Sequence, residues 1–215
     1  FTKALFEAAG VPVTPHVVIR EANWMRDPEA ALEAVRSLGG LPLFVKPARA
    51  GSSVGVSKVT SMDAFADAVE KSFKEDNKLV VERGVVGREV EVAVLEGRAG
   101  AKPRVSVAGE IIVKGRDFYD FEAKYLDEDS VDLVIPAQLT DDELQEMQEI
   151  ARKAFQAIGG EGLGRVDFFL TKNGFIVNEI NTMPGFTRLS MFPSLWQASG
   201  VDYKSLITEL IELAL

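Results

Sequence analysis

The chain has 215 residues, enough to bury a substantial core in one domain or in two closely joined lobes. Its formal net charge of -9 argues against a nucleic-acid or anionic-membrane partner, because those surfaces are bound by basic faces. The absence of cysteine excludes a disulfide framework, a zinc-thiolate site and a thiol nucleophile. The only histidine, His16, follows a proline before a short strand, which argues against Ser-His-Asp catalysis, and no apolar run is long enough to cross a bilayer.

The first part of the chain is predicted to alternate short helices and strands. Residues 1–10 have the pattern of an amphipathic helix closed by Gly10, with neither an initiator Met nor an N-cap, so we expect a piece of a longer protein. Asp27 and Pro28 supply an N-cap and a favoured first residue for a helix that runs to Leu38. The other elements expected here are strands at 17–19, 43–47, 56–59 and 79–85 and a helix at 62–73.

A lysine at a strand end, Lys46, is followed by a loop of glycine and serine at residues 51–55. Backbone N–H groups of such a loop can wrap phosphate oxygens, and a lysine on a rigid strand can neutralise their charge. A plain β-turn is the alternative, because no Gly-Lys-Ser/Thr sequence opens a helix here. Glu82, beside the bend at Gly84, could hold an adenine or a ribose, although a strand-end glutamate is more often solvated.

The second part of the chain is predicted to be richer in strands. Residues 114–132 are polar and aromatic without a clear period, which indicates a lid. Thr140 and Glu143 form a capping box for a helix that runs to residue 158. The other elements expected here are an antiparallel set of strands at 89–95, 104–107 and 110–113 and helices at 194–199 and 203–215.

Two apolar runs, 164–170 and 175–181, flank an Asn-Gly pair and predict a β-hairpin. The length of the turn decides which side chains share a face. A two-residue Asn173-Gly174 turn would place Asp167 opposite Ile180. A three-residue turn from Lys172 to Gly174 would instead place Asp167 opposite Glu179 and Arg165 opposite Asn181.

The three-residue turn gathers a cation, two carboxylates and an amide on one patch. Oxygen ligands of this kind, few in number and leaving room for phosphate and water, suit Mg²⁺. The alternative is a solvated hairpin face with a surface cluster of charges. We favour the metal site, because the strands are otherwise apolar on both faces and leave little room for a solvent face.

Four motifs complete the pattern: KPARAGSSVG at 46–55, FYDFEAKY at 118–125, GRVD at 164–167 and NEINTMPG at 178–185. Together, and in this order across essentially the whole chain, they resemble the D-alanine-D-alanine ligases of the ATP-grasp superfamily. The resemblance implies an α+β ATP-grasp fold in which two α+β lobes with mainly antiparallel sheets clasp ATP. These lobes would be residues 1–88, with the phosphate loop and hinge, and 89–215, with the lid loop 114–132 and the metal hairpin 163–181.

The resemblance also implies roles in nucleotide and metal binding. The residues implied to contact ATP are Lys46 on the α- and β-phosphates, Ser52 and Ser53 in the loop over the phosphates, Lys124 on the γ-phosphate, Glu82 and Val85 at the adenine, Phe44 and Phe169 on either side of the ring, and Glu89 at the ribose. The implied ligands of Mg²⁺, or of Mn²⁺, are Asp167, Glu179 and Asn181, with two ions expected.

For the reaction, the resemblance implies that a first D-alanine attacks the γ-phosphate and a second attacks the resulting acyl phosphate. Arg165 and the Gly185 N–H would stabilise the oxyanion, and Ser190 with the Met191 backbone would cradle the second carboxylate. Tyr125 would close over the substrates with Ser52 and favour D-alanine over D-lactate.

The implied biology is peptidoglycan precursor synthesis in the cytoplasm by a protein that is a homodimer at full length and has no nucleic-acid or membrane partner. A D-alanine-D-lactate or other ATP-grasp ligase is the alternative enzyme, and a nucleotide-binding or dimerisation module without catalysis is the alternative class. The family has a preceding domain that supplies part of the first D-alanine site. We therefore expect residues 1–215 alone to bind Mg-ATP but to have little ligase activity.

Overall fold

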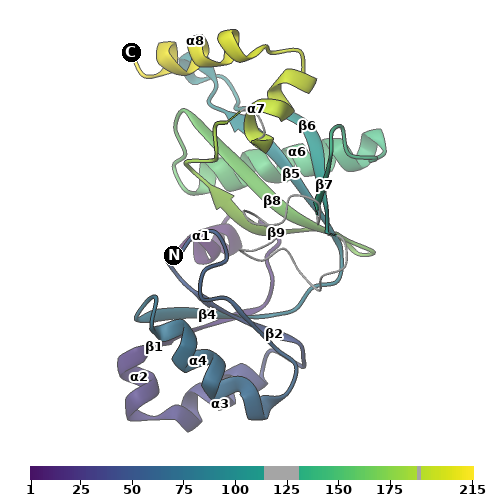
Figure 1. The fold of residues 1–215 in the computed structure, drawn as a ribbon. Helices are drawn as coiled ribbons and strands as arrows, with labels where there is room; N and C mark the ends of the chain where they lie inside the picture. The colour runs from purple at the N-terminus through teal and green to yellow at the C-terminus, as the bar shows by residue number, and fades with distance from the viewer. Residues whose placement is uncertain (114–130, 188–189) are drawn as a thin grey trace. The chain divides into compact units, whose positions relative to one another are not determined.

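The computed structural model describes residues 1–113, 131–187 and 190–215, which form two compact units (Figure 1). Unit 1 contains residues 1–13, 86–112 and 132–215, and unit 2 is built on residues 14–85. The N-terminal helix, expected in the lobe of residues 1–88, therefore lies in the unit formed by the second half of the chain, and that unit resumes at residue 86. Phe6 and Val11 explain this placement, since both are buried in the core of unit 1.

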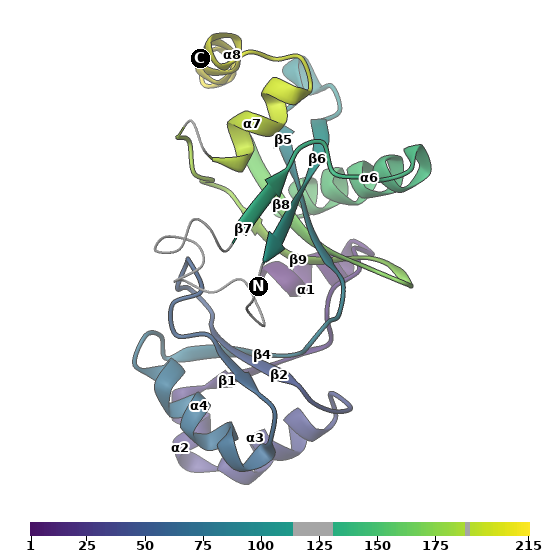
Figure 2. The same ribbon diagram turned by 45° about the vertical axis from the view of Figure 1, so that its right-hand side comes forward.

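Unit 2 is a four-stranded sheet with strand order β1-β4-β2-β3 and helices on one face (Figure 2). All three of its strand pairs are antiparallel. Its elements are β1 (His16–Arg20), α2 (Glu21–Arg26), α3 (Pro28–Arg36), β2 (Leu43–Pro47), β3 (Ser57–Val59), a 3₁₀ helix η1 (Met62–Ala64), α4 (Phe65–Phe73) and β4 (Lys78–Arg83).

Alternation along β2 gives the unit 2 sheet one apolar and one polar face. Leu43 and Val45 are buried in the core formed with the helices, whereas Phe44 and Lys46 are half-buried on the other face. The predicted cap of α3 is confirmed, because Asp27 Oδ1 accepts a hydrogen bond of 3.0 Å from the Ala30 backbone N–H. The sheet thus presents Lys46 on the face that the helices leave uncovered.

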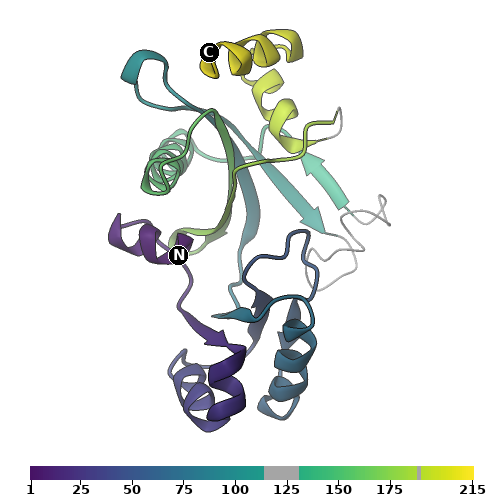
Figure 3. The ribbon, with the colours of Figure 1, turned by 90° about the vertical axis from the view of Figure 1, so that its left-hand side faces the viewer.

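Unit 1 is a five-stranded sheet with strand order β7-β6-β5-β8-β9. Its elements are α1 (Thr2–Ala8), β5 (Arg88–Leu95), a 3₁₀ turn η2 (Arg98–Gly100), β6 (Arg104–Val113), β7 (Val131–Val134), α6 (Asp141–Ala157), β8 (Leu163–Thr171), β9 (Gly174–Asn181), α7 (Met191–Ala198) and α8 (Tyr203–Leu213). Helix α6 covers one face of the sheet, and α7 lies on the opposite side (Figure 3). The capping box of α6 is confirmed, with reciprocal bonds between Thr140 and Glu143.

Some element predictions are wrong, and helix α2 and strand β7 were not predicted. Strand β6 is continuous across residues 108–109, where separate strands at 104–107 and 110–113 were predicted. Gly109 is needed for packing rather than for a turn, because a Cβ atom there would lie 2.7 Å from Met191 Sδ on α7. Helix α7 begins at Met191 rather than at residue 194, since Pro193 fits its first turn. Helix α2 was not predicted; its N-cap, Arg20, makes no side-chain capping bond that could have signalled its start.

The predicted lid falls almost wholly outside the described residues. Its last residues, Val131 and Asp132, are described and belong to strand β7. Within the described part of the chain, no helix combines the length and the apolar character needed to span a membrane.

Candidate functional site

The hairpin β8–β9 has the predicted pairing at the site but not the predicted turn. Arg165 lies opposite Asn181, and Asp167 lies opposite Glu179. At the tip, however, Thr171 pairs with Gly174, so the turn contains only Lys172 and Asn173 rather than three residues. The pairing then shifts by one residue between Asp167 and Phe168, and this β-bulge compensates for the shorter turn.

The bulge decides which face Glu179 occupies. Phe168 pairs with Val177 and both are buried in the core beneath α6, whereas the next pair toward the site is Asp167 with Glu179. Asn178 is the extra residue of β9. Without it, Asn178 would oppose Asp167 and Glu179 would point into the core.

The N-terminal segment holds β9 at this point. The Val177 N–H donates to the Pro12 carbonyl at 2.8 Å, and Val13 forms a parallel bridge with Val177. Lys3 Nζ, on α1, donates to the carbonyl of Asn178 at 3.3 Å. The bulge is therefore fixed by contacts from residues that lie far away in sequence.

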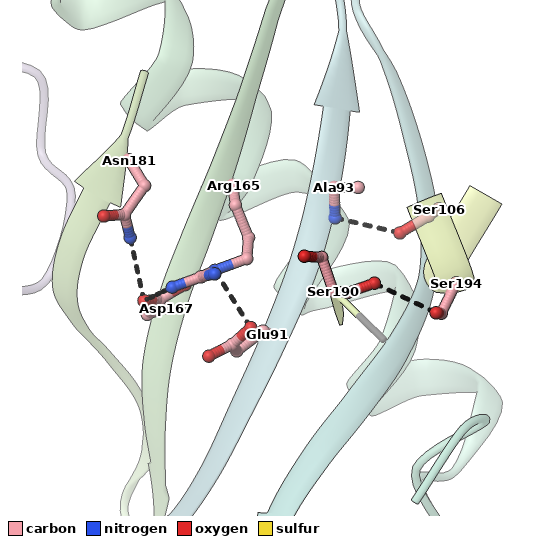
Figure 4. A network of polar contacts seen from close by, with 8 residues as sticks. All are labelled: Glu91, Ala93, Ser106, Arg165, Asp167, Asn181, Ser190 and Ser194. Atoms are coloured by element: carbon pink, nitrogen blue, oxygen red, sulfur yellow. Dashed lines mark hydrogen bonds and ion pairs between the residues drawn. The ribbon is translucent and has the colours of Figure 1, made fainter. Parts of the chain in front are cut away.

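Three carboxylates stand in one row across the sheet of unit 1. Strand β5 pairs with β8 so that Glu91 lies opposite Asp167, and Asp167 lies opposite Glu179 on its other side. Directly opposite residues share a face, so the row places all three on the face away from α6. Arg165 and Asn181 form the adjacent row, and Figure 4 shows Arg165 between Glu91 and Asp167.

Arg165 is held by two carboxylates. Its Nε lies 2.7 Å from Asp167 Oδ1 and 2.9 Å from Glu91 Oε2, and its Nη2 donates to Asp167 Oδ2 at 2.7 Å. Burial by itself lowers the pKa of the Arg165 guanidinium, but the charge of Asp167, followed by those of Glu91 and Glu179, raises it by more. The net pKa lies above the ordinary value, so Arg165 is a permanent cation at this site.

Asp167 and Asn181 suit a hard cation such as Mg²⁺. Asn181 donates its Nδ2 to Asp167 Oδ2 at 2.9 Å, which directs its amide oxygen away from that carboxylate. With Glu179, the donors are two carboxylates and one amide, all oxygen ligands. Across the described residues, no group of three or more His, Cys, Asp or Glu side chains forms a ready metal cluster. Three oxygen donors would leave room around an ion for water or phosphate.

Other predicted residues of unit 1 fall on the same sheet face or on the loop after β9. Phe169 lies opposite Glu89 on β5, which places the residues predicted for the adenine ring and the ribose side by side. Gly185 approaches Ser190 so closely that a Cβ atom there would lie 2.9 Å from Ser190 Oγ. Ser190 precedes the predicted carboxylate contact, Met191, and makes no capping bond to α7; its Oγ accepts instead from the Thr187 N–H at 2.9 Å.

In unit 2, the lysine that is predicted to bind phosphate contacts a glutamate that is predicted to bind adenine. Lys46 Nζ donates to Glu82 Oε2 at 2.6 Å, and Glu82 is only 3% exposed, which contradicts a solvated strand-end glutamate. Phe44 lies opposite Glu82 in the pairing of β2 with β4. Val85, the remaining adenine residue, is half-buried just after β4.

The glycine-containing loop of unit 2 is anchored at both stems and turned at its tip. Arg49 pairs with Asp76 and donates to Asn77 Oδ1 at 2.8 Å, whereas Ser72 Oγ donates to the Gly55 carbonyl at 2.7 Å. Between the stems, Ser52 and Ser53 have φ angles of 56° and 59°, a backbone conformation that serine rarely adopts. Strain of this kind is typical of ligand-binding loops.

The Gly55→Ala variant is expected to destabilise unit 2 by about 1 to 3 kcal/mol. Gly55 has a φ of +72°, and a Cβ atom there would lie 2.7 Å from Glu75 Cγ and 2.8 Å from Pro47 Cγ. Gly51→Ala is the matched control in the same loop, because nothing lies within 4 Å of its Cβ position. Urea denaturation of both variants tests the expectation, and equal losses of stability would contradict it.

Two predicted residues, Lys124 and Tyr125, lie outside the described residues. Conversely, the sequence interpretation missed Glu91. Its signal was the alternation of Glu89 and Glu91 with Val90 and Val92, which places two acids on one face of an otherwise apolar strand.

Comparison with known proteins identifies the family. The family model described as D-ala D-ala ligase C-terminus matches residues 5–212. The chain belongs to this family. The D-alanine--D-alanine ligase of Pseudarthrobacter chlorophenolicus is 52% identical over 218 aligned residues, which cover 100% of this chain and 57% of that protein. The corresponding ligase of Bacillus velezensis is 49% identical and is matched over 99% of this chain and 59% of its own length.

Solved structures agree with this family assignment. The VanG D-Ala:D-Ser ligase from Enterococcus faecalis matches with a TM-score of 0.86 and 32% identity, covering 100% of this chain and 60% of that one. D-alanyl-alanine synthetase A from Vibrio cholerae matches with a TM-score of 0.84 and 33% identity, covering 100% and 64%. The predicted α+β ATP-grasp fold is thereby confirmed for a member of the D-Ala-D-Ala ligase C-terminus family. The chain spans a little more than half the length of the curated relatives that it matches.

Proposed function

We propose that the protein is an ATP-dependent, ADP-forming ligase that joins two D-alanines into D-alanyl-D-alanine through an acyl phosphate, for peptidoglycan precursor synthesis. The family match and the relatives named D-alanine--D-alanine ligase support this proposal. The observation that carries it is the contact between Arg165 and Asp167, beside Glu179 and Asn181. One patch thereby combines a cation for a developing oxyanion with oxygen donors for a metal.

Unit 1 is proposed to supply the metal and oxyanion groups. Asp167, Glu179 and Asn181 would hold Mg²⁺ or Mn²⁺, with two ions proposed, and the bound metal would offset the charge on the transferred phosphoryl group. Arg165 would stabilise the tetrahedral oxyanion together with the Gly185 N–H, a kind of contact worth about 3 kcal/mol per donor. Ser190 and the Met191 backbone would receive the carboxylate of the second D-alanine.

Unit 2 is proposed to bind nucleotide. Lys46 would contact the α- and β-phosphates, with Glu82 as its counter-ion when no nucleotide is present. Ser52 and Ser53 would cover the phosphates, because their left-handed backbone turns successive N–H groups toward one side of the loop. The other expected contacts remain predictions. They are those of Phe44, Val85 and Glu89 with adenine and ribose, of Phe169 with the ring, and of Lys124 and Tyr125 in a lid.

The proposal is tested by measuring phosphate release from ATP by the complete protein, with D-alanine, L-alanine, D-lactate or D-serine as substrate, and by identifying the products. D-alanine is expected to give D-alanyl-D-alanine and ADP, whereas L-alanine gives no product. D-serine belongs in the panel because one similar structure is a D-Ala:D-Ser ligase. Formation of a depsipeptide as readily as the dipeptide would favour the D-alanine-D-lactate alternative, and no dependence on any D-substrate would overturn the ligase assignment.

A cytoplasmic location, a homodimer and the absence of nucleic-acid and membrane partners are proposed with this function. The negative net charge supports the last of these. The mass of the complete protein in solution, measured by light scattering, tests the dimer.

A further inference from the structure

Glu91 is a buried carboxylate for which the proposed reaction has no role. It is 5% exposed, lies on the central strand β5, and faces the same side of the sheet as Asp167. A buried carboxylate is costly unless it is paired, and Glu91 forms an ion pair with Arg165, at 2.9 Å from Nε to Oε2. The ion pair with Arg165 thus compensates part of the cost of burying a charge at this position of the strand.

Arg165 contacts two carboxylates, of which only Asp167 is expected to bind a metal. Asp167 accepts hydrogen bonds from Arg165 Nε and Nη2 and is also an expected metal ligand. The metal and the guanidinium therefore compete for its oxygens. Glu91 lies on the other side of Asp167 from Glu179, the second expected carboxylate ligand. Glu91 can therefore retain the guanidinium while Asp167 turns its oxygens to a metal.

We propose that Glu91 is a positioning residue that anchors Arg165 to strand β5 and thereby leaves Asp167 available for the divalent cation. This inference rests on the proposed function for the roles of Arg165 and Asp167. Without Glu91, the only carboxylate that Arg165 hydrogen-bonds among the described residues is Asp167, and a divalent cation must displace the guanidinium from it. With Glu91, the guanidinium keeps one carboxylate partner whether or not the metal is bound.

The test is Mn²⁺ binding to the complete protein, measured by electron paramagnetic resonance without substrates. Glu91→Gln keeps the shape of the side chain, and we expect it to weaken Mn²⁺ binding about 10-fold, within the range for partners that orient metal ligands. Glu110→Gln is the matched control, because Glu110 on β6 binds Arg88 on β5 through two hydrogen bonds of 2.7 Å and is likewise a sheet glutamate paired with an arginine. It is expected to lower thermal stability and to leave Mn²⁺ affinity unchanged.

A double-mutant cycle separates positioning from direct ligation. If Glu91 acts through Arg165, Glu91→Gln changes Mn²⁺ affinity by less than about 3-fold in an Arg165→Met background. An equal effect in both backgrounds would show that Glu91 acts on the metal directly, and it would overturn the positioning role. So would a Glu91→Gln variant that loses thermal stability but binds Mn²⁺ like the unsubstituted protein.

Failure of the proposed function would appear separately. In that case the unsubstituted protein would release no phosphate with D-alanine, while the Mn²⁺ comparison of Glu91→Gln and Glu110→Gln would still decide the role of Glu91.

Discussion

Replacing Asp167 with asparagine is expected to reduce Mg²⁺-dependent phosphate release by the complete protein at least about 100-fold, since loss of a direct ligand should exceed the effect of losing an outer-shell partner. Asp167 is the central carboxylate of the row, with Glu91 on one side and Glu179 on the other. Asparagine keeps the shape and one acceptor oxygen but removes the charge that attracts the metal. Phosphate release over a range of Mg²⁺ concentrations measures the effect.

The fold should survive this substitution, because Arg165 keeps Glu91 as a partner. Asp202→Ala is a suitable control for a general loss of stability. Asp202 caps α8 through a 3.0 Å bond from the Ser205 N–H, so its loss costs about 1 kcal/mol without touching the site. Unchanged turnover in Asp167→Asn would remove Asp167 from the metal site.

Replacing Phe6 with alanine is expected to destabilise unit 1 by about 3 to 5 kcal/mol. Phe6 is 1% exposed and lies in the core that α6 covers, although it comes from the first helix of the chain. The cavity left by the ring would loosen α1, and with it the contacts of Lys3 and Pro12 with β9. Urea denaturation measures the loss.

Amide hydrogen exchange locates this loss. Peptides from β8 and β9 should exchange faster in Phe6→Ala, whereas peptides from β2 and β4 of unit 2 should not change. Leu5→Ala is the control at the neighbouring position. Because Leu5 is 45% exposed, its truncation should cost about 0.5 kcal/mol. Faster exchange in β2 and β4 instead would place α1 with unit 2, as the sequence had suggested.

Local signals in the sequence predicted most of the elements. The Asp27 cap with Pro28 and the Thr140 capping box each involve residues within one helical turn, and both helices begin where these signals place them. Strand β2 has the predicted bounds because its alternation is regular. The pairing of Asp167 with Glu179 was also predicted, although the three-residue turn assumed for it is wrong.

What the sequence did not reveal depends on contacts between distant residues. Gly109 looks like a break in a strand until α7 packs against it. The role inferred for Glu91 depends on Arg165. Strands β6 and β7 and helix α6 separate these two residues in the chain, but their strands, β5 and β8, are neighbours in the sheet. The place of α1 likewise follows from its packing against a core that forms from residues after position 86.

The bulge at Asn178 gives the hairpin two ways to hold the same surplus residue. A two-residue turn with a bulge and a three-residue turn without one produce the same alignment of Asp167 with Glu179. Moving the surplus residue to the tip would keep the row of carboxylates but would turn Val177 and Phe175, which are buried, to the opposite face of the sheet. Lys3 and Pro12, which contact Asn178 and Val177, select the mid-strand position, and Thr171 Oγ1 secures the short tip by donating to the Gly174 carbonyl at 2.9 Å.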